Sequence, residues 1–220
     1  IEKMTIPDTV TEIEEYSFAY MVRLKEVSFN DNIKKIDKGT FYQCRALRKV
    51  KLPKNIEELA TSAFDMWRSL EKIERSGGNN VYKIMNSCIV KKKDMSAVCC
   101  YAKGNQYNIP KGVRILRKHS FANCRAKKVN IPTSVKKIEG AVFSYKYWKE
   151  FNRDIEDVTV AKSSKYYARD GRTIYNKKDN SLSIAIIKAK KGVNTYVMSD
   201  RVKLLNANQN VINYENWNRR

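Results

Sequence analysis

"FYQCRALRKVKLPKNIEELATSAF" (residues 41–64) runs from one phenylalanine to the next, and this spacing recurs along the chain. Phe18, Phe41 and Phe64 lie 23 residues apart, and four further apolar columns keep the same period. These columns are Val10, Ile33 and Ile56; Ile13, Ile36 and Leu59; Leu24, Leu47 and Leu70; and Val27, Val50 and Ile73. Self-similarity at a fixed period indicates a stacked repeat architecture.

A second block carries the same pattern at a period of 22, because Val113, Leu116 and Phe121 are followed by the column partners Val135, Ile138 and Phe143. The unit is I-P-x-x-V-x-x-I-x-x-x-x-F-x-x-C-x-x-L-x-x-V. One unit is too small to bury its apolar face, so we expect the units to stack on a continuous core. The L-x-x-V and V-x-x-I pieces predict short strands, and F-x-x-C predicts a helical or 3₁₀ turn. Proline at the start of a unit ends the preceding strand, since it has no N–H to donate.

The repeat resembles the BspA-like class of leucine-rich repeats. "SAFDMWRSLEKI" (62–73) and "SFANCRAKKVNIP" (120–132) carry the resemblance, which covers most of residues 5–160. It implies a β-leaning leucine-rich-repeat solenoid with short helical or 3₁₀ turns.

A longer repeat interrupts the array. "YKIMNSCIVKKKDMSAVCCYAK" (82–103) aligns with "YARDGRTIYNKKDNSLSIAIIK" (167–188) at a constant offset of 85 residues. Each block predicts a strand, a polar turn and a second strand, and the BspA-like resemblance implies β-hairpin inserts at these places. We therefore expect one solenoid domain over 1–220. It comprises repeats at 5–76 and 109–160, hairpin inserts at 79–108 and 165–195, and a divergent terminal repeat or cap at 196–220.

The chain is strongly basic, with a net charge of +21 and a pI near 9.8. Such a field attracts polyanions, although a solvated basic surface without a partner gives the same composition. The apolar runs are short, such as "IAII" at 184–187, and none approaches the roughly 20 residues of a membrane-spanning helix. The start lacks Met and an apolar leader, which is typical of a mature or trimmed fragment.

Two of the five cysteines occupy one repeat column, which Met21 and Trp67 fill in other units. A column that accepts Met, Cys and Trp is an apolar packing position. The expected core includes Phe18, Phe41, Cys44, Phe64, Phe121, Cys124 and Phe143.

The other three cysteines lie in the first insert, where Cys88 would face Cys99 or Cys100 across the hairpin. A disulfide there is one alternative in an oxidising compartment. The second insert has Thr173, Ile184 and Ala185 at these positions, so the hairpin does not require the sulfurs.

No motif indicates catalysis or metal binding. His119 is the only histidine and has no sequence partner that would make it a base, and no C-x-x-C pair predicts a zinc site. We expect no catalytic residue, no metal site and no cofactor, and we do not expect an enzyme.

The candidate binding surface consists of outward strand positions and exposed aromatics. The basic candidates are Arg48, Lys49, Lys51, Lys127 and Lys128, and the aromatic candidates are Tyr145, Tyr147 and Trp148 in a long loop. Acidic rungs such as Glu71 to Glu74 separate the basic ones, which weakens the hypothesis of a continuous polyanion track.

The BspA-like resemblance implies a secreted or cell-surface, adhesin-like scaffold whose partner is another protein, such as a host matrix or cell-surface protein. The alternative function is a basic scaffold that binds a polyanion, either nucleic acid or a sulfated glycan. Such a scaffold could act alone or as a subunit of a larger assembly. The oligomeric state stays open, as does the functional meaning of the net charge.

Overall fold

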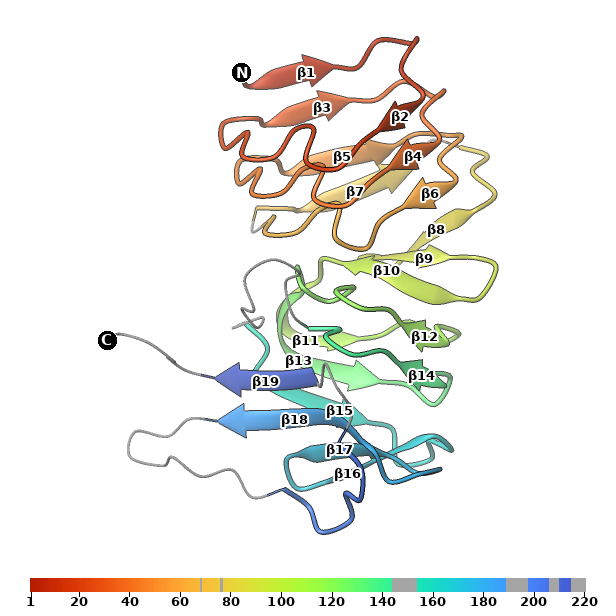
Figure 1. Cartoon of the computed structure of the whole chain (residues 1–220), viewed down its shortest axis with the longest axis vertical. Helices are drawn as coiled ribbons and strands as arrows, with labels where there is room; N and C mark the ends of the chain where they lie inside the picture. Colours follow the sequence, from red (N-terminus) through yellow and green to blue (C-terminus); the bar gives the residue numbers. More distant parts are fainter. Residues whose placement is uncertain (68, 76, 144–153, 189–197, 206–209, 215–220) are drawn as a thin grey trace, which may run out of the picture.

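The structure is a computed structural model that describes residues 1–220 except 68, 76, 144–153, 189–197, 206–209 and 215–220. Every regular element in the described part of the chain is a β-strand. The strands stack in layers along the longest axis of the molecule, with the N-terminus at one end of the stack (Figure 1). The predicted leucine-rich-repeat solenoid is confirmed.

The N-terminal block contains two parallel sheets. The L-x-x-V pieces form β1 (Lys3–Thr5), β3 (Glu26–Ser28), β5 (Lys49–Leu52) and β7 (Lys72–Arg75), in that order. The V-x-x-I pieces form β2 (Glu12–Ile13), β4 (Lys35–Ile36) and β6 (Glu58–Leu59). In both sheets each residue pairs with the one 23 positions later, as Val27 does with Val50. The sequence period is therefore the register of the sheets.

The F-x-x-C pieces form successive turns. Among the described residues, none of these turns is a helix. Within one turn, the Cys44 N–H donates to the Phe41 carbonyl at 3.2 Å. Between layers, the Phe41 N–H donates to the Ala63 carbonyl at 3.0 Å. Because the N–H groups of Gly39, Phe41 and Gln43 donate to the neighbouring layer, the turn does not continue as a helix. The phenylalanines stack inside, with 6.2 Å between the ring centroids of Phe41 and Phe64.

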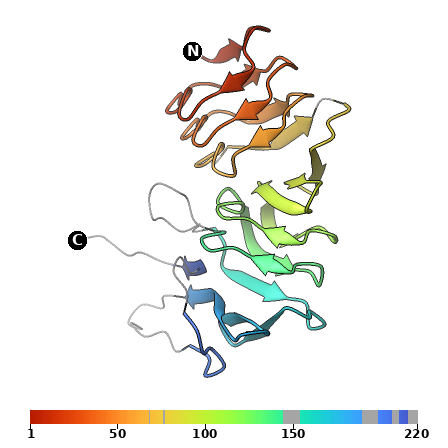
Figure 2. The same ribbon diagram turned by 45° about the vertical axis from the view of Figure 1, so that its right-hand side comes forward.

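The first insert contains one strand more than the predicted hairpin. Its strands are β8 (Tyr82–Met85), β9 (Cys88–Lys91) and β10 (Ser96–Cys100), paired antiparallel in sequence order. Asn86 and Ser87 both have positive φ values, 41° and 57°, which is the geometry of a tight type I′ hairpin turn. The alternation of β9 and β10 places Ile89 and Val98 in the core of the N-terminal block and Val90 and Ala97 in the next core. The insert is thus a layer with two buried faces, and it lies between the two blocks of repeats (Figure 2).

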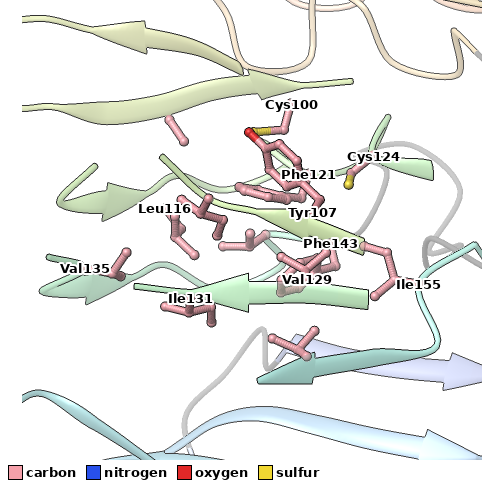
Figure 3. Packing of buried hydrophobic residues seen from close by; sticks show 14 of the residues in the cluster. Cys100, Tyr107, Leu116, Phe121, Cys124, Val129, Ile131, Val135, Phe143 and Ile155 are labelled. Carbon is pink, nitrogen blue, oxygen red and sulfur yellow. The ribbon is translucent and has the colours of Figure 1, made fainter. Parts of the chain in front are cut away.

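The second block resumes both parallel stacks. Strands β12 (Ile115–Leu116) and β14 (Lys137–Ile138) extend the sheet of β8 to β10, with β12 parallel to β10. A separate sheet contains β11 (Lys103–Asn108), β13 (Arg125–Ile131) and β15 (Asp157–Val160). Phe121 and Phe143 pack between these sheets with 5.5 Å between their ring centroids, and Tyr107 covers Phe121 from the side of Cys100 (Figure 3).

The second insert also has three antiparallel strands, β16 (Tyr167–Asp170), β17 (Thr173–Asn176) and β18 (Leu182–Lys188). A final strand, β19 (Asn210–Tyr214), pairs with β18 in parallel. Ile174 and Ile184 face the core of the preceding block.

Candidate binding surfaces

The rung of Arg48, Lys49 and Lys51 projects from the sheet of β1, β3, β5 and β7. Arg48 pairs with Glu71 at 3.6 Å, and both side chains are largely exposed. Lys51 lies opposite Glu74, whose carboxylate is 2.5 Å from the Lys72 amine. The hydrogen bond from Lys72 holds the pKa of Glu74 below its usual value. The rung therefore lies inside an alternating pattern of charge rather than in a uniformly basic patch.

Ion pairs between successive rungs run along the N-terminal block. They join residues 23 positions apart, namely Glu2 and Lys25 (2.9 Å), Lys3 and Glu26 (3.1 Å), Glu15 and Lys38 (2.7 Å), Lys34 and Glu57 (3.9 Å), and Arg48 and Glu71 (3.6 Å). Each exposed pair alone contributes little to stability, because water and salt screen its charges. Their shared spacing favours the register in which one layer stacks on the next.

The second predicted basic rung is also opposed by acids. Lys127 pairs with Glu156 at 3.6 Å, and Lys128 lies opposite Asp157 in the register of β13 and β15. Asp157 in turn pairs with Arg169 at 2.9 Å. The structure does not bring this rung together with Arg48, Lys49 and Lys51, because the first insert separates the two sheets.

The aromatic candidates Tyr145, Tyr147 and Trp148 lie outside the described residues. The exposed aromatic side chains of the described part belong instead to the first F-x-x-C turn, where Tyr16 is 39% and Tyr20 is 59% exposed, beside Val22 at 50%. Tyr20 packs edge-to-face on Tyr42 with 5.3 Å between ring centroids. The same turn lines a shallow groove with Met4 at the N-terminal end of the stack. The signal for this cluster is the pair of tyrosines that flank the core Phe of the first unit only.

The positive charge is distributed very unevenly. Residues 1–75 contain 14 basic and 13 acidic side chains, a net charge of +1, whereas residues 76–220 contain 30 and 10, a net charge of +20. Between residues 82 and 138, Asp94 is the only acid against 14 basic residues. The distribution of charge along the sequence locates the basic region after residue 75. The rung of Arg48 lies outside that region.

Much of this charge lies on one surface, which we call the β12–β14 basic face. Its members are Lys93, Lys111, Arg114, Lys118, Lys136 and Lys137, all exposed, on or beside strands β12 and β14. None of these six residues is among the binding residues predicted from the sequence.

All five cysteines are buried free thiols. Burial raises the pKa of Cys44 to about 11 and that of Cys124 to about 12, so both are thiols at neutral pH. The Cys44 thiol donates to the Phe18 carbonyl at 3.1 Å. Cys88 lies opposite Cys100 in the ladder, whereas Cys99 lies opposite Ile89. Of the two pairings considered, the register therefore places Cys100 beside Cys88.

The core candidates are placed together in the interior. Phe41, Cys44, Phe64, Phe121, Cys124 and Phe143 are at most 1% exposed, and Phe18 is half-buried at the N-terminal end. His119 is buried in a turn with a positive φ of 65°. Its backbone N–H donates to the Ala141 carbonyl at 3.0 Å.

Within the described ranges, no group of three or more His, Cys, Asp or Glu side chains is arranged to hold a metal ion. The same part of the chain contains no helix with the length and apolar character needed to cross a membrane.

Comparisons with known proteins agree with this architecture. A leucine-rich cell-surface protein from Faecalibacterium prausnitzii A2-165 has a TM-score of 0.59 at 20% identity, over 72% of this chain and 41% of that one. The pneumococcal vaccine antigen PcpA has a TM-score of 0.58 at 19% identity, over 72% and 39%. This chain thus spans about two fifths of the length of these two structures, and at these identities the likeness shows the fold.

A search of curated proteins found no match. The family scan matches the BspA-type leucine-rich repeat region, in six copies, over residues 1–100 and 99–176. The chain therefore belongs to the BspA-type leucine-rich repeat family.

Proposed function

We propose that this chain is a non-catalytic, adhesin-like scaffold at the cell surface or in the secreted fraction, whose partner is another protein. The observation that carries the proposal is the exposed cluster of Tyr16, Tyr20 and Val22 at the end of a sheet with alternating charges. Tyrosine is enriched among the residues that dominate binding energy at interfaces. Family membership and the likeness to a leucine-rich cell-surface protein and to a pneumococcal vaccine antigen support this function.

The test is binding of the chain to a panel of purified extracellular-matrix proteins, followed by the double variant Tyr20→Ser/Val22→Ser. Loss of a central aromatic anchor costs 2 kcal/mol or more, so we expect binding to weaken by about 30-fold or more. Leu205→Ser is the matched control, because Leu205 is 61% exposed at the opposite end of the stack. Equal loss in both variants, or no retention of any matrix protein, would contradict the proposal.

A second candidate function, polyanion binding, is favoured by a different observation, the net charge of +20 in residues 76–220 against +1 in residues 1–75. Its surface is distinct from the tyrosine cluster.

A further inference from the structure

Equivalent columns in the two blocks carry opposite charge patterns. In the N-terminal block the V-x-x-I rungs alternate, with Lys35 between Glu12 and Glu58 in the register of β2, β4 and β6. In the second block, Lys136 and Lys137 occupy the positions that Glu57 and Glu58 hold in the repeat. The same scaffold position therefore changes from an acidic rung to a basic one.

Backbone hydrogen bonds place the basic rungs side by side. The Arg114 N–H donates to the Met95 carbonyl at 2.9 Å, and the Lys136 and Lys137 N–H groups donate to the Arg114 carbonyl at 2.8 and 3.1 Å. Neighbouring strands lie about 4.8 Å apart, so Arg114 and Lys136 project from adjacent rungs of one surface. Lys93 lies two residues before Met95 in the adjoining turn.

Two turns extend this surface on either side. The Gly112 N–H donates to the Ser134 hydroxyl at 3.1 Å, which places the turn of Lys111 beside the next rung. The Lys118 N–H donates to the Glu139 carboxylate at 2.9 Å, which places Lys118 on the other side. The cations of the β12–β14 basic face therefore form one continuous surface rather than isolated positions.

Few acids compensate this charge. Asp94 is engaged by Arg117 at 2.6 Å, and Glu139 lies 3.5 Å from Lys137. Lys93, Lys111, Arg114, Lys118 and Lys136 form no ion pair with any residue that the structure describes. In the N-terminal block, by contrast, Lys34 and Lys35 each have an acidic partner within 4 Å.

We propose that the β12–β14 basic face binds an anionic polysaccharide. Five of its six cations are lysines, which bind anions as point charges, whereas nucleic-acid recognition favours the bidentate guanidinium of Arg. One aromatic ring lies beside the face, that of Tyr166, but it is half-buried and the Lys136 amine lies 5.8 Å from its centroid. No large aromatic side chain of the described residues is exposed on the face, so an open base-stacking platform is missing there. A surface with cations repeated on adjacent strands suits a flexible chain with regularly spaced sulfate or carboxylate groups.

This inference goes beyond the adhesin-like function and does not require it. The two surfaces are separate, since the tyrosine cluster belongs to the first repeat and the basic face to the second block. A variant of either surface can therefore fail its own test without affecting the other.

The experiment measures the affinity of the whole chain for heparin, a sulfated polysaccharide, as a function of salt. The test variant is Lys111→Gln/Arg114→Gln/Lys136→Gln, and the control is Arg48→Gln/Lys49→Gln/Lys51→Gln, which removes the same charge from the N-terminal sheet. We expect the slope of log affinity against log salt to fall by about one for each cation removed from the face. Affinity at about 0.15 M salt should fall tenfold or more in the test variant and less than threefold in the control.

A single-stranded oligonucleotide of matched charge is the second probe, and circular dichroism checks that each variant keeps its fold. Tighter binding of the oligonucleotide than of heparin would overturn the polysaccharide in favour of nucleic acid. Equal losses in the two variants would show that net charge, and not this face, attracts heparin. Absence of heparin binding at about 0.15 M salt would also overturn the proposal.

Discussion

The two inserts share a sequence pattern and local contacts but occupy different environments. Tyr82 and Tyr167 are the first residues of the first strand in each insert. The hydroxyl group of each accepts a hydrogen bond from the last V-x-x-I strand of the preceding block. The Leu59 N–H donates to the Tyr82 hydroxyl at 2.9 Å, and the Ile138 N–H donates to the Tyr167 hydroxyl at 2.8 Å. The two tyrosines lie 85 residues apart, so the sequence offset between the inserts corresponds to an equivalent hydrogen bond in each.

The difference lies on the far face of each insert. In the first insert, Ala97 lies opposite Leu116 in the parallel ladder, and both are fully buried. In the second, Leu182 donates its N–H to the Leu204 carbonyl, but Leu204 and Leu205 are 46% and 61% exposed. The same pattern therefore gives an interior layer where a second block of repeats covers it, and a layer beside exposed residues where Leu204 and Leu205 lie against it.

Substitutions at equivalent buried positions of the two inserts should give the largest difference in stability. Ala97→Asp places a carboxylate in the fully buried core of the second block without a partner, which costs more than about 4 kcal/mol and abolishes folding. Leu182→Asp loses apolar burial but lies beside an exposed rung, so we expect a loss of about 2–3 kcal/mol with folding retained. Urea unfolding followed by circular dichroism measures both.

The control for this pair is Ser183→Asp, at a half-buried position on the same strand as Leu182. It should change the free energy of unfolding by less than about 1 kcal/mol. Similar losses for Ala97→Asp and Leu182→Asp would mean that the two inserts are equally enclosed.

The tyrosine pair gives a smaller effect. Tyr82→Phe leaves the Leu59 N–H unsatisfied in a buried site, at a cost of about 1–3 kcal/mol. Tyr167→Phe should cost about 0.5–1 kcal/mol, because the Ile138 N–H that it leaves is only partly buried. Thermal unfolding of the two variants measures the difference, and a larger loss for Tyr167→Phe would contradict the assignment of the first insert as the interior layer.

The repeat pattern predicted the fold because its apolar columns are also the register of the sheets. Val27, Val50 and Ile73 pair across strands in the order that the 23-residue period implies. The two buried faces of the first insert were not predicted, because a short apolar run such as "SAVCCYA" does not show which residues meet which neighbour. Which block covers each face depends on tertiary contacts.

The binding surface was predicted less well for an electrostatic reason. Arg48 is conspicuous in sequence, but Glu71 reaches it from the next rung at 3.6 Å. Lys111 and Lys118 are far from Lys136 in the sequence, and the turns of the solenoid bring them beside the rungs of Arg114 and Lys136. Charge compensation and charge clustering between layers are properties of the stacking, so local sequence reasoning does not reveal them.

The smallest expected effect concerns the equivalent acids in the two insert turns, Asp94 and Asp179. Burial alone would raise the pKa of Asp94, but hydrogen bonds from Ser96 and the pair with Arg117 outweigh it and lower that pKa. The pKa of Asp179 is lowered mainly by a hydrogen bond from Ser181.

A carboxyl group whose pKa is lower in the folded state stabilises the fold above its unfolded pKa, near 3.9, and loses this contribution as pH falls through the folded value. Asp94→Asn should therefore flatten the loss of stability below about pH 4 and lower the stability at pH 7 by about 0.5–1 kcal/mol. Asp179→Asn should change the pH profile less, because no cation pairs with Asp179 among the described residues. Unfolding free energies at pH 7 and at about pH 3 measure both variants, and a flatter profile for Asp179→Asn than for Asp94→Asn would remove the Arg117 pair as the distinguishing feature of the first turn.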